Sequence, residues 1–285
     1  MAMNRIEVRE HAILMEALGL RTRVLEAGAG APVVLLHGNP DNADEWRPLM
    51  GYLAKHHRCI APDFPGYGKS PMPPARFTYS LDDQMRFLEG VLQALQVAEP
   101  FVLVVHDTGG MVGTAWAAAN RQRLRGMMYT NCVAFEGFAW FAIAKLWGAE
   151  ARLGRLRAQL GMLALGLSQG ALFRKIFAHQ SPQLSVAQLD RFASSFATNG
   201  VAKATALRQF REFMRPGFFA GFDVMRARLL ERVPCRVLWG DQDPYIPVHY
   251  ARCFGGAHVT ILPEAGHWVP LIAPQQLAEE ISQFH

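Results

Sequence analysis

The stretch VVHDTGGMVG, residues 104–113, places one acid between an apolar, strand-like segment and a glycine-rich, helix-like segment. An apolar run that leads into Asp107 is typical of a strand buried on both faces. Gly109 and Gly110 allow the helix that follows to lie close to that strand. The stretch therefore predicts a sharp strand-to-helix turn with the carboxylate of Asp107 at its corner.

The rest of the chain extends this alternation of strands and helices in both directions. An antiparallel pair is expected first, and SLDDQMRFLEGVLQALQV has helical spacing and a Ser that can cap its first turn. Alternating elements of this kind predict an α/β fold, with a mostly parallel central sheet and helices on both faces. The predicted strands are HAILMEA, RTRVLEAG, APVVLLHG, HRCIAPD, PFVLVVHD, LRGMMYTNC, PCRVLWG and AHVTILPEA.

The alternation stops between residues 133 and 230, where several helix-like segments follow one another. We expect this segment to be a helical cap inserted into the sheet domain. The domain itself is then made of two parts, residues 1–132 and 231–285.

Composition limits the class of protein. The 285 residues are 51% hydrophobic and 19% charged, which suits a globular domain with a substantial core. No apolar run reaches the roughly 18–20 residues of a membrane span, and the first ten residues carry charges where a secretory signal is apolar. We therefore expect a cytoplasmic protein without a membrane partner. The four cysteines lack the spacing of a metal site and are expected to be reduced.

The net charge of +5 is concentrated in the expected cap. Residues 133–230 contain 13 Lys and Arg against 5 Asp and Glu, a net charge of +8, which leaves −3 for the remainder. In RLGRLRAQLGMLALGL the charges alternate with leucines, so we expect the arginines on the solvated face of an amphipathic helix. Nucleic acid is not an expected partner.

Three residues that can carry chemistry follow predicted strands. They are Asp107, Asp243 a few residues beyond VLWG, and His267 just beyond TILPEA. Ligands of open parallel sheets bind at the carboxyl ends of the strands, so these side chains are expected to meet there. Asp241 competes for the place of Asp243, but Asp243 has the better distance from the strand.

Five motifs resemble those of the α/β-hydrolase superfamily, in the same order and spacing. They are LLHGNP, DFPGYGKS, VVHDTGG, VLWGDQDPYIP and EAGHWVP, and they span nearly the whole chain outside the expected cap. HGNP and an aspartate at the turn resemble the branch of haloalkane dehalogenases and epoxide hydrolases. Nucleophile, acid and histidine also follow one another in the order of that superfamily.

The resemblance implies an enzyme in which Asp107 is the nucleophile, His267 the general base and Asp243 the acid that orients the base. A serine that attacked a saturated carbon would leave an ether, whereas an aspartate leaves an ester that activated water can hydrolyse. The backbone N–H groups of Asn39 and Thr108 would form the oxyanion hole. Two alternatives stay open: Asp107 as a helix cap, and a protein that binds a ligand without turnover.

The leaving group is less certain from the sequence. Dehalogenases often have a Trp after the nucleophile, where this chain has Thr108; Asn39, Trp140, Trp147 and Asn131 are the remaining candidate donors. Epoxide hydrolases normally use cap tyrosines, and no Tyr occurs between residues 133 and 230. Cleavage of a small apolar haloalkane is therefore favoured over that of an epoxide, a β-lactone or another activated ester. Water is the co-substrate, no metal or cofactor is expected, and the protein is a monomer or a small homo-oligomer.

Overall fold

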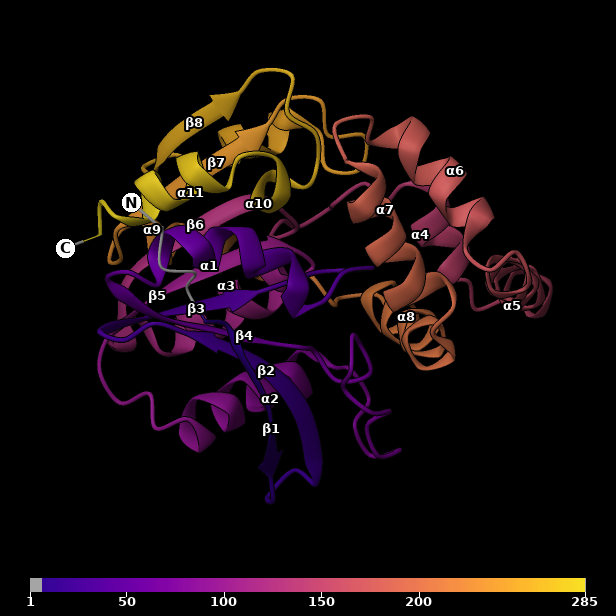
Figure 1. The fold of residues 1–285 in the computed structure, drawn as a ribbon, viewed down its shortest axis with the longest axis horizontal. Coiled ribbons are helices and arrows are strands. Elements are labelled where there is room, and N and C mark those ends of the chain that lie inside the picture. Colours follow the sequence, from indigo (N-terminus) through magenta and orange to yellow (C-terminus); the bar gives the residue numbers. More distant parts are fainter. Residues whose placement is uncertain (1–6, 285) are drawn as a thin grey trace.

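The computed structural model describes residues 7–284 and consists of an eight-stranded sheet with helices on both faces and a group of helices at one end (Figure 1). The strand order is β1-β2-β4-β3-β5-β6-β7-β8. β1 and β2 are antiparallel to their neighbours, and all the other pairs are parallel. The strands are β1 (Arg9–Met15), β2 (Leu20–Ala27), β3 (Ala31–Leu36), β4 (His57–Pro62), β5 (Phe101–Asp107), β6 (Leu124–Cys132), β7 (Cys235–Gly240) and β8 (His258–Leu262).

Two hydrophobic cores, one on each face of the sheet, hold the helices in place. The alternation of β5 is plain: Val102 and Val104 belong to one core, and Leu103 and Val105 belong to the other. One face is covered by α1 (Arg47–Leu53), α10 (Val269–Ile272) and α11 (Pro274–Ile281), which contact one another. The opposite face is covered by α2 (Leu81–Ala94), α3 (Gly109–Ala119) and α9 (Phe222–Leu230). The predicted α/β class and the antiparallel opening pair are confirmed.

The predicted cap of α2 is also present, because the Ser80 side chain accepts a hydrogen bond from the N–H of Asp83. None of the helices within residues 7–284 is both long and apolar enough to cross a bilayer. The structure contains four free cysteines, of which Cys59, Cys132 and Cys235 are buried and Cys253 is exposed.

The segment between β6 and β7 is helical, as its sequence pattern predicts. Five of its α-helices pack on one another beyond the end of the sheet (Figure 1). The sixth, α9, packs against α3 and so lies with the helices of the sheet domain. The five are α4 (Ala142–Trp147), α5 (Arg152–Leu167), α6 (Ala171–Gln180), α7 (Val186–Phe192) and α8 (Gly200–Phe213), with a π-helical turn at Ala193–Ala197.

α5 differs from its expected orientation in one respect. Its arginines are exposed, as expected, but so are five of its leucines. Ala158, Met162 and Leu165 form the buried face of α5 instead. Because Arg and Leu alternate in the first turns of α5, the sequence pattern does not show which face is buried. The small Ala158 and the flexible Met162 pack against the neighbouring helices in place of the leucines.

Candidate active site

Asp107 occupies the corner that the sequence predicts. It is the last residue of β5 and has φ +49°, a left-handed conformation that Asp tolerates better than most residues. A side chain at Gly109 would place its Cβ 2.5 Å from the carbonyl oxygen of Leu36, so a glycine is required there. Gly38 is required as well, because a Cβ there would collide with the side chain of Asp107. The backbone therefore fixes where the carboxylate lies.

The two carboxylate oxygens of Asp107 have different surroundings. Oδ1 accepts a 2.7 Å hydrogen bond from the backbone N–H of Asn39. Oδ2 lies 3.5 Å from Nε2 of His267. The side chain does not cap α3, whose first turn has no side-chain cap. Within residues 7–284, the N–H of Thr108 finds no hydrogen-bond acceptor, so it can serve a group bound at Asp107.

Asp243 holds His267 in one tautomer. Nδ1 of His267 lies 2.7 Å from Oδ2 of Asp243, and because a carboxylate only accepts, Nδ1 carries the proton. Nε2 is then free to accept a proton. The other oxygen of Asp243 accepts the N–H groups of Tyr245 at 2.7 Å and Ile246 at 2.9 Å. All three side chains are buried: Asp107 is 7% exposed, Asp243 6% and His267 2%.

Asn131 supports this arrangement from the end of β6 and does not line the cavity. Its side-chain N–H groups donate to Oδ2 of Asp243 at 2.7 Å and to the carbonyl oxygen of Gly240. Its own amide oxygen accepts the N–H of Gly240. The expected role of Asn131 as a donor to the leaving group therefore finds no support, because its polar atoms already bind Asp243 and β7.

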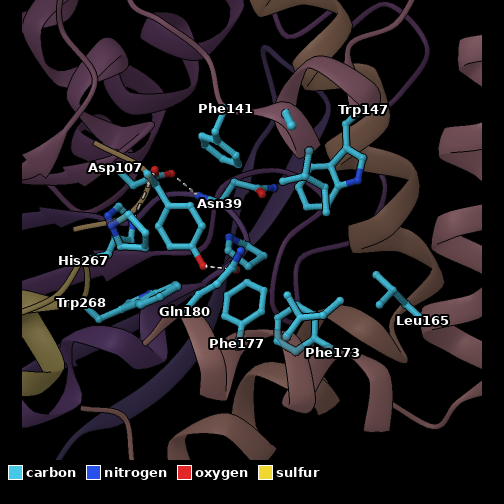
Figure 2. A pocket seen from close by; sticks show the side chains of 16 residues that line it. Asn39, Asp107, Phe141, Trp147, Leu165, Phe173, Phe177, Gln180, His267 and Trp268 are labelled. Carbon is cyan, nitrogen blue, oxygen red and sulfur yellow. Dashed lines mark hydrogen bonds and ion pairs between the residues drawn. The ribbon is translucent and has the colours of Figure 1, made fainter. Parts of the chain in front are cut away.

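A cavity of about 250 Å³ opens in front of Asp107 and His267. Figure 2 shows Asp107 and His267 on one side, Trp147 and Leu165 on the opposite side, and Phe173 and Phe177 below. Most of the residues that line the cavity are apolar. It is lined by Asn39, Pro40, Asp107, Phe141, Ala142, Ile143, Trp147, Leu165, Phe173, Ile176, Phe177, Gln180, Pro244, Tyr245, His267 and Trp268.

The two candidate tryptophans are in different places. Trp147 lines the cavity, whereas the ring of Trp140 stacks on Phe213 and meets Phe210 edge-on, away from the cavity lining. Trp140 is thus not a donor to the cavity, because its ring is packed among the aromatic side chains of Phe210 and Phe213. The side chain of Asn39 is partly engaged, since its amide donates to the hydroxyl of Tyr67 at 2.6 Å.

Tyr245 is a cavity residue that the motif-based analysis missed. Its hydroxyl donates to Oε1 of Gln180 at 2.7 Å, and its ring meets that of His267 edge-on at 5.2 Å. Burial raises the pKa of this phenol, so it carries its proton at neutral pH. The cavity therefore contains a phenol although the segment 133–230 has no tyrosine. The position of Tyr245, two residues after Asp243, was the signal in the sequence that could have placed it at the cavity.

A buried polar cluster lies behind Asp107. Nε2 of His106 is 3.0 Å from the carbonyl oxygen of His267, and Nδ1 is 3.1 Å from Oε2 of Glu45. Burial raises the pKa of Glu45, and the nearby Asp41 carboxylate raises it further. Burial lowers the pKa of His106. Burial thus favours the neutral form of both groups, and in that state a proton of His106 is held toward His267 and that of Glu45 is available to Nδ1.

Asp41 connects the same cluster to the helices beyond the sheet. Its carboxylate accepts two hydrogen bonds from Arg191 of α7, at 2.6 and 3.0 Å. Paired bonds between a guanidinium and a carboxylate are strong and directional. Asp41 is 1% exposed, so this pair fixes α7 next to the loop that contains Asn39.

Comparison with known proteins agrees with the geometry. A profile of the family described as alpha/beta hydrolase fold matches residues 31–274. A cis-3-alkyl-4-alkyloxetan-2-one decarboxylase of Shewanella oneidensis is 38% identical over 119 residues, which are 41% of this chain and 37% of that protein. A haloalkane dehalogenase of Sphingobium indicum is 36% identical over 123 residues, 42% of this chain and 41% of that protein. The chain thus aligns with less than half of the length of either relative.

Solved structures agree with the fold over nearly the whole chain. The epoxide hydrolase CorEH superposes with a TM-score of 0.76 at 19% sequence identity, covering 98% of this chain and 98% of that one. A similarity at this identity supports the architecture of sheet and helices.

Proposed function

Because the chain belongs to the α/β-hydrolase-fold family, we propose that it is a hydrolase that works through a covalent ester on Asp107. The observation that carries this proposal is the unequal environment of the two oxygens of Asp107. One accepts the N–H of Asn39, and the other lies beside His267, while Asp107 itself lines the cavity. The two oxygens can therefore take different parts in a two-step reaction.

In the first step, Oδ2 of Asp107 attacks a saturated carbon of the substrate. The bond from that carbon to the leaving group breaks, and the leaving group departs with the electron pair. The product of this step is an alkyl ester of Asp107. Apolar walls suit such a step, because they exclude water that would otherwise stabilise the free carboxylate.

In the second step, Nε2 of His267 takes a proton from a water molecule, whose oxygen attacks the carboxyl carbon of the ester. Negative charge then develops on Oδ1, beside the N–H groups of Asn39 and Thr108. Asp243 stabilises the cationic form of His267. The alcohol leaves with the former Oδ2, and the oxygen of water stays on Asp107.

The helices between β6 and β7 complete this scheme as a cap. We assign residues 133–230 to the cap domain and residues 1–132 and 231–285 to the hydrolase core. Phe141, Trp147, Leu165 and Phe177 belong to the cap segment and contribute apolar walls to the cavity. A cap of this kind would favour a small apolar substrate.

A carbon–halogen bond is our first candidate for the bond that is cleaved. Support comes from the similarity to haloalkane dehalogenases and from Trp147 and Asn39, two residues of the cavity lining whose side chains carry N–H groups. A departing halide accepts such N–H groups and needs no proton donor.

A strained ring that contains oxygen is the second candidate, and the pair of Tyr245 and Gln180 favours it. A departing alkoxide needs a proton or strong hydrogen bonds, and the Tyr245 hydroxyl can supply them from within the cavity. The relative named for an oxetan-2-one, a four-membered cyclic ester, is 38% identical to this chain, and the haloalkane dehalogenase is 36% identical.

A substrate panel with separate readouts tests both candidates. Haloalkanes, terminal epoxides and β-lactones of four to eight carbons would be assayed for halide, diol, and hydroxy acid or carbon dioxide. The Asp107→Asn variant is the control and should release none of them. A single turnover in ¹⁸O-labelled water should leave the label in the peptide that contains residue 107. Product formation without that label would refute the ester mechanism.

A further inference from the structure

An unpartnered row of leucines runs along α5. Figure 1 shows α5 at the end of the molecule farthest from the sheet. The exposed fractions are large for leucine: Leu153 59%, Leu156 50%, Leu160 54%, Leu163 55% and Leu167 74%. Exposed apolar patches of this extent mark interaction sites on most soluble proteins.

The spacing of these leucines gives the row a definite geometry. They recur at intervals of three, four, three and four residues, which places them in one narrow line along the helix. A strict line of this kind is the seam of a pair of packed helices, because each leucine fits between side chains of the facing helix. The opposite face of α5 is already buried in the structure, so only this seam is available.

Charge is distributed unevenly along the same helix. Arg152, Arg155 and Arg157 lie in its first two turns, and residues 158–167 contain no charged side chain. Among the ion pairs found within residues 7–284, none involves these three arginines. Positive charge at a helix N-terminus adds to the positive end of the helix dipole, which is unfavourable.

We propose that α5 pairs antiparallel with α5 of a second copy of this chain. In that arrangement the arginines of one helix lie beside the C-terminal half of the other. That half carries the negative end of the dipole and no charged side chain of its own, and Lys203 of α8 reaches it at Gly166. The partner's half thus offsets part of the unfavourable charge of each helix. A parallel pair would place the arginines of both copies together.

The neighbours of the leucines in the second half also suit close packing. Gly161, Ala164 and Gly166 are small, and a Cβ added at Gly161 would meet no atom within 4 Å. The two seams together bury on the order of 1,000 Å², near the lower limit of specific interfaces. We therefore expect a dissociation constant in the micromolar range, on the order of 1–100 μM.

An anionic lipid surface fits the seam less well. A helix that lies in a bilayer surface has a wide apolar face with cationic residues along its length. On α5 the apolar row is narrow, and the cations stop at Arg157.

Sedimentation equilibrium of the full chain tests the pairing. The wild type should change from monomer to dimer between about 1 and 300 μM, the range set by the expected affinity. Leu160→Lys, at the middle of the seam, should weaken the dimer at least tenfold. Leu14→Lys is the matched control, because Leu14 is 58% exposed on β1, and it should leave the dimer unchanged. Circular dichroism would verify that both variants are folded.

Cross-linking tests the direction of the helices. In a Cys253→Ser background, which removes the exposed cysteine, single Leu153→Cys and Leu167→Cys variants would be treated with a short bis-maleimide. A mixture of the two should give a cross-linked dimer, whereas either variant alone should give little.

Any of these results would overturn the proposal: a wild type that stays monomeric at 300 μM, a dimer that Leu160→Lys leaves intact, or strong cross-linking of Leu153→Cys with itself. Wild-type monomers that float with phosphatidylserine vesicles through the same leucines would overturn it too, and would assign the seam to lipid. None of these outcomes depends on the reaction proposed above.

Discussion

Asn131 donates a 2.7 Å hydrogen bond to Asp243, and the oxygen that accepts it is the one that also binds His267. The end of β6 and the loop that follows β7 therefore meet at a single carboxylate oxygen. This contact places residue 131 close enough to His267 to take over the role of the acid.

Asp243→Asn should lower kcat by about 10³-fold or more, because the amide no longer stabilises cationic His267 or selects its tautomer. Adding Asn131→Asp to that variant should recover at least tenfold, since a carboxylate then lies beside the same ring nitrogen. Steady-state kinetics on the best substrate of the panel measure both. If Asn131→Asp recovers nothing in the Asp243→Asn background, Asn131 is a structural residue only.

His267→Gln should form the ester and fail to hydrolyse it, because Gln cannot take the proton from water. Intact-protein mass spectrometry after incubation with substrate should show an added mass: that of the alkyl group less one hydrogen for a haloalkane, or that of the whole substrate for a strained ring. The double variant Asp107→Asn/His267→Gln should show no added mass. An unmodified His267→Gln protein that still turned over substrate would contradict the assignment of the base.

Tyr245→Phe separates the two candidate leaving groups. For epoxides or β-lactones, loss of the hydroxyl should lower kcat about 10²- to 10⁴-fold, the usual contribution of a proton donor. Halide release should change by only a few fold, because a halide needs no proton. Tyr52→Phe, at an exposed tyrosine outside the cavity lining, is the control. Equal losses for both substrate classes would indicate that Tyr245 acts by positioning His267.

Glu45→Gln should change how stability depends on pH. Glu45 has a raised pKa in the folded chain and an ordinary pKa, about 4.5, in the unfolded chain. Its contribution is therefore fully present below pH 4.5 and is lost as pH rises toward the folded pKa. The free energy of unfolding of Glu45→Gln should rise relative to wild type by up to about 1.4 kcal/mol per pH unit above pH 4.5.

Urea denaturation at half-unit steps from pH 4.5 to 8 measures this difference. His106 is common to both proteins, so its opposite dependence cancels to first order in the comparison. A constant difference between the two proteins across this range would show that Glu45 is ionised in the folded state.

The sheet and the position of Asp107 were predictable because both depend on local patterns. The apolar run that ends at Asp107 is long enough for one buried strand, and the glycines that follow specify the turn. Asp107, Asp243 and His267 follow strands, and parallel strands bring their carboxyl ends to one edge of a sheet.

The residues that could not be predicted depend on contacts between distant segments. Tyr245 reaches the cavity because Gln180, 65 residues away, accepts its hydroxyl. Glu45 is 61 residues from His106, and no motif connects them. The exposure of Leu160 depends on which face of α5 the cap buries, and both faces are apolar enough to be chosen.

At the turn around residue 107, the place where a bond can form and the atom that can form it depend on different parts of the chain. Gly109 allows the turn and Gly38 leaves room for the side chain at 107, so the main chain determines where a bond is formed. The side chain at 107 determines only which atom forms it. An evolving lineage could thus exchange one nucleophile for another by a single codon change and keep the scaffold, the relay and the binding chamber intact.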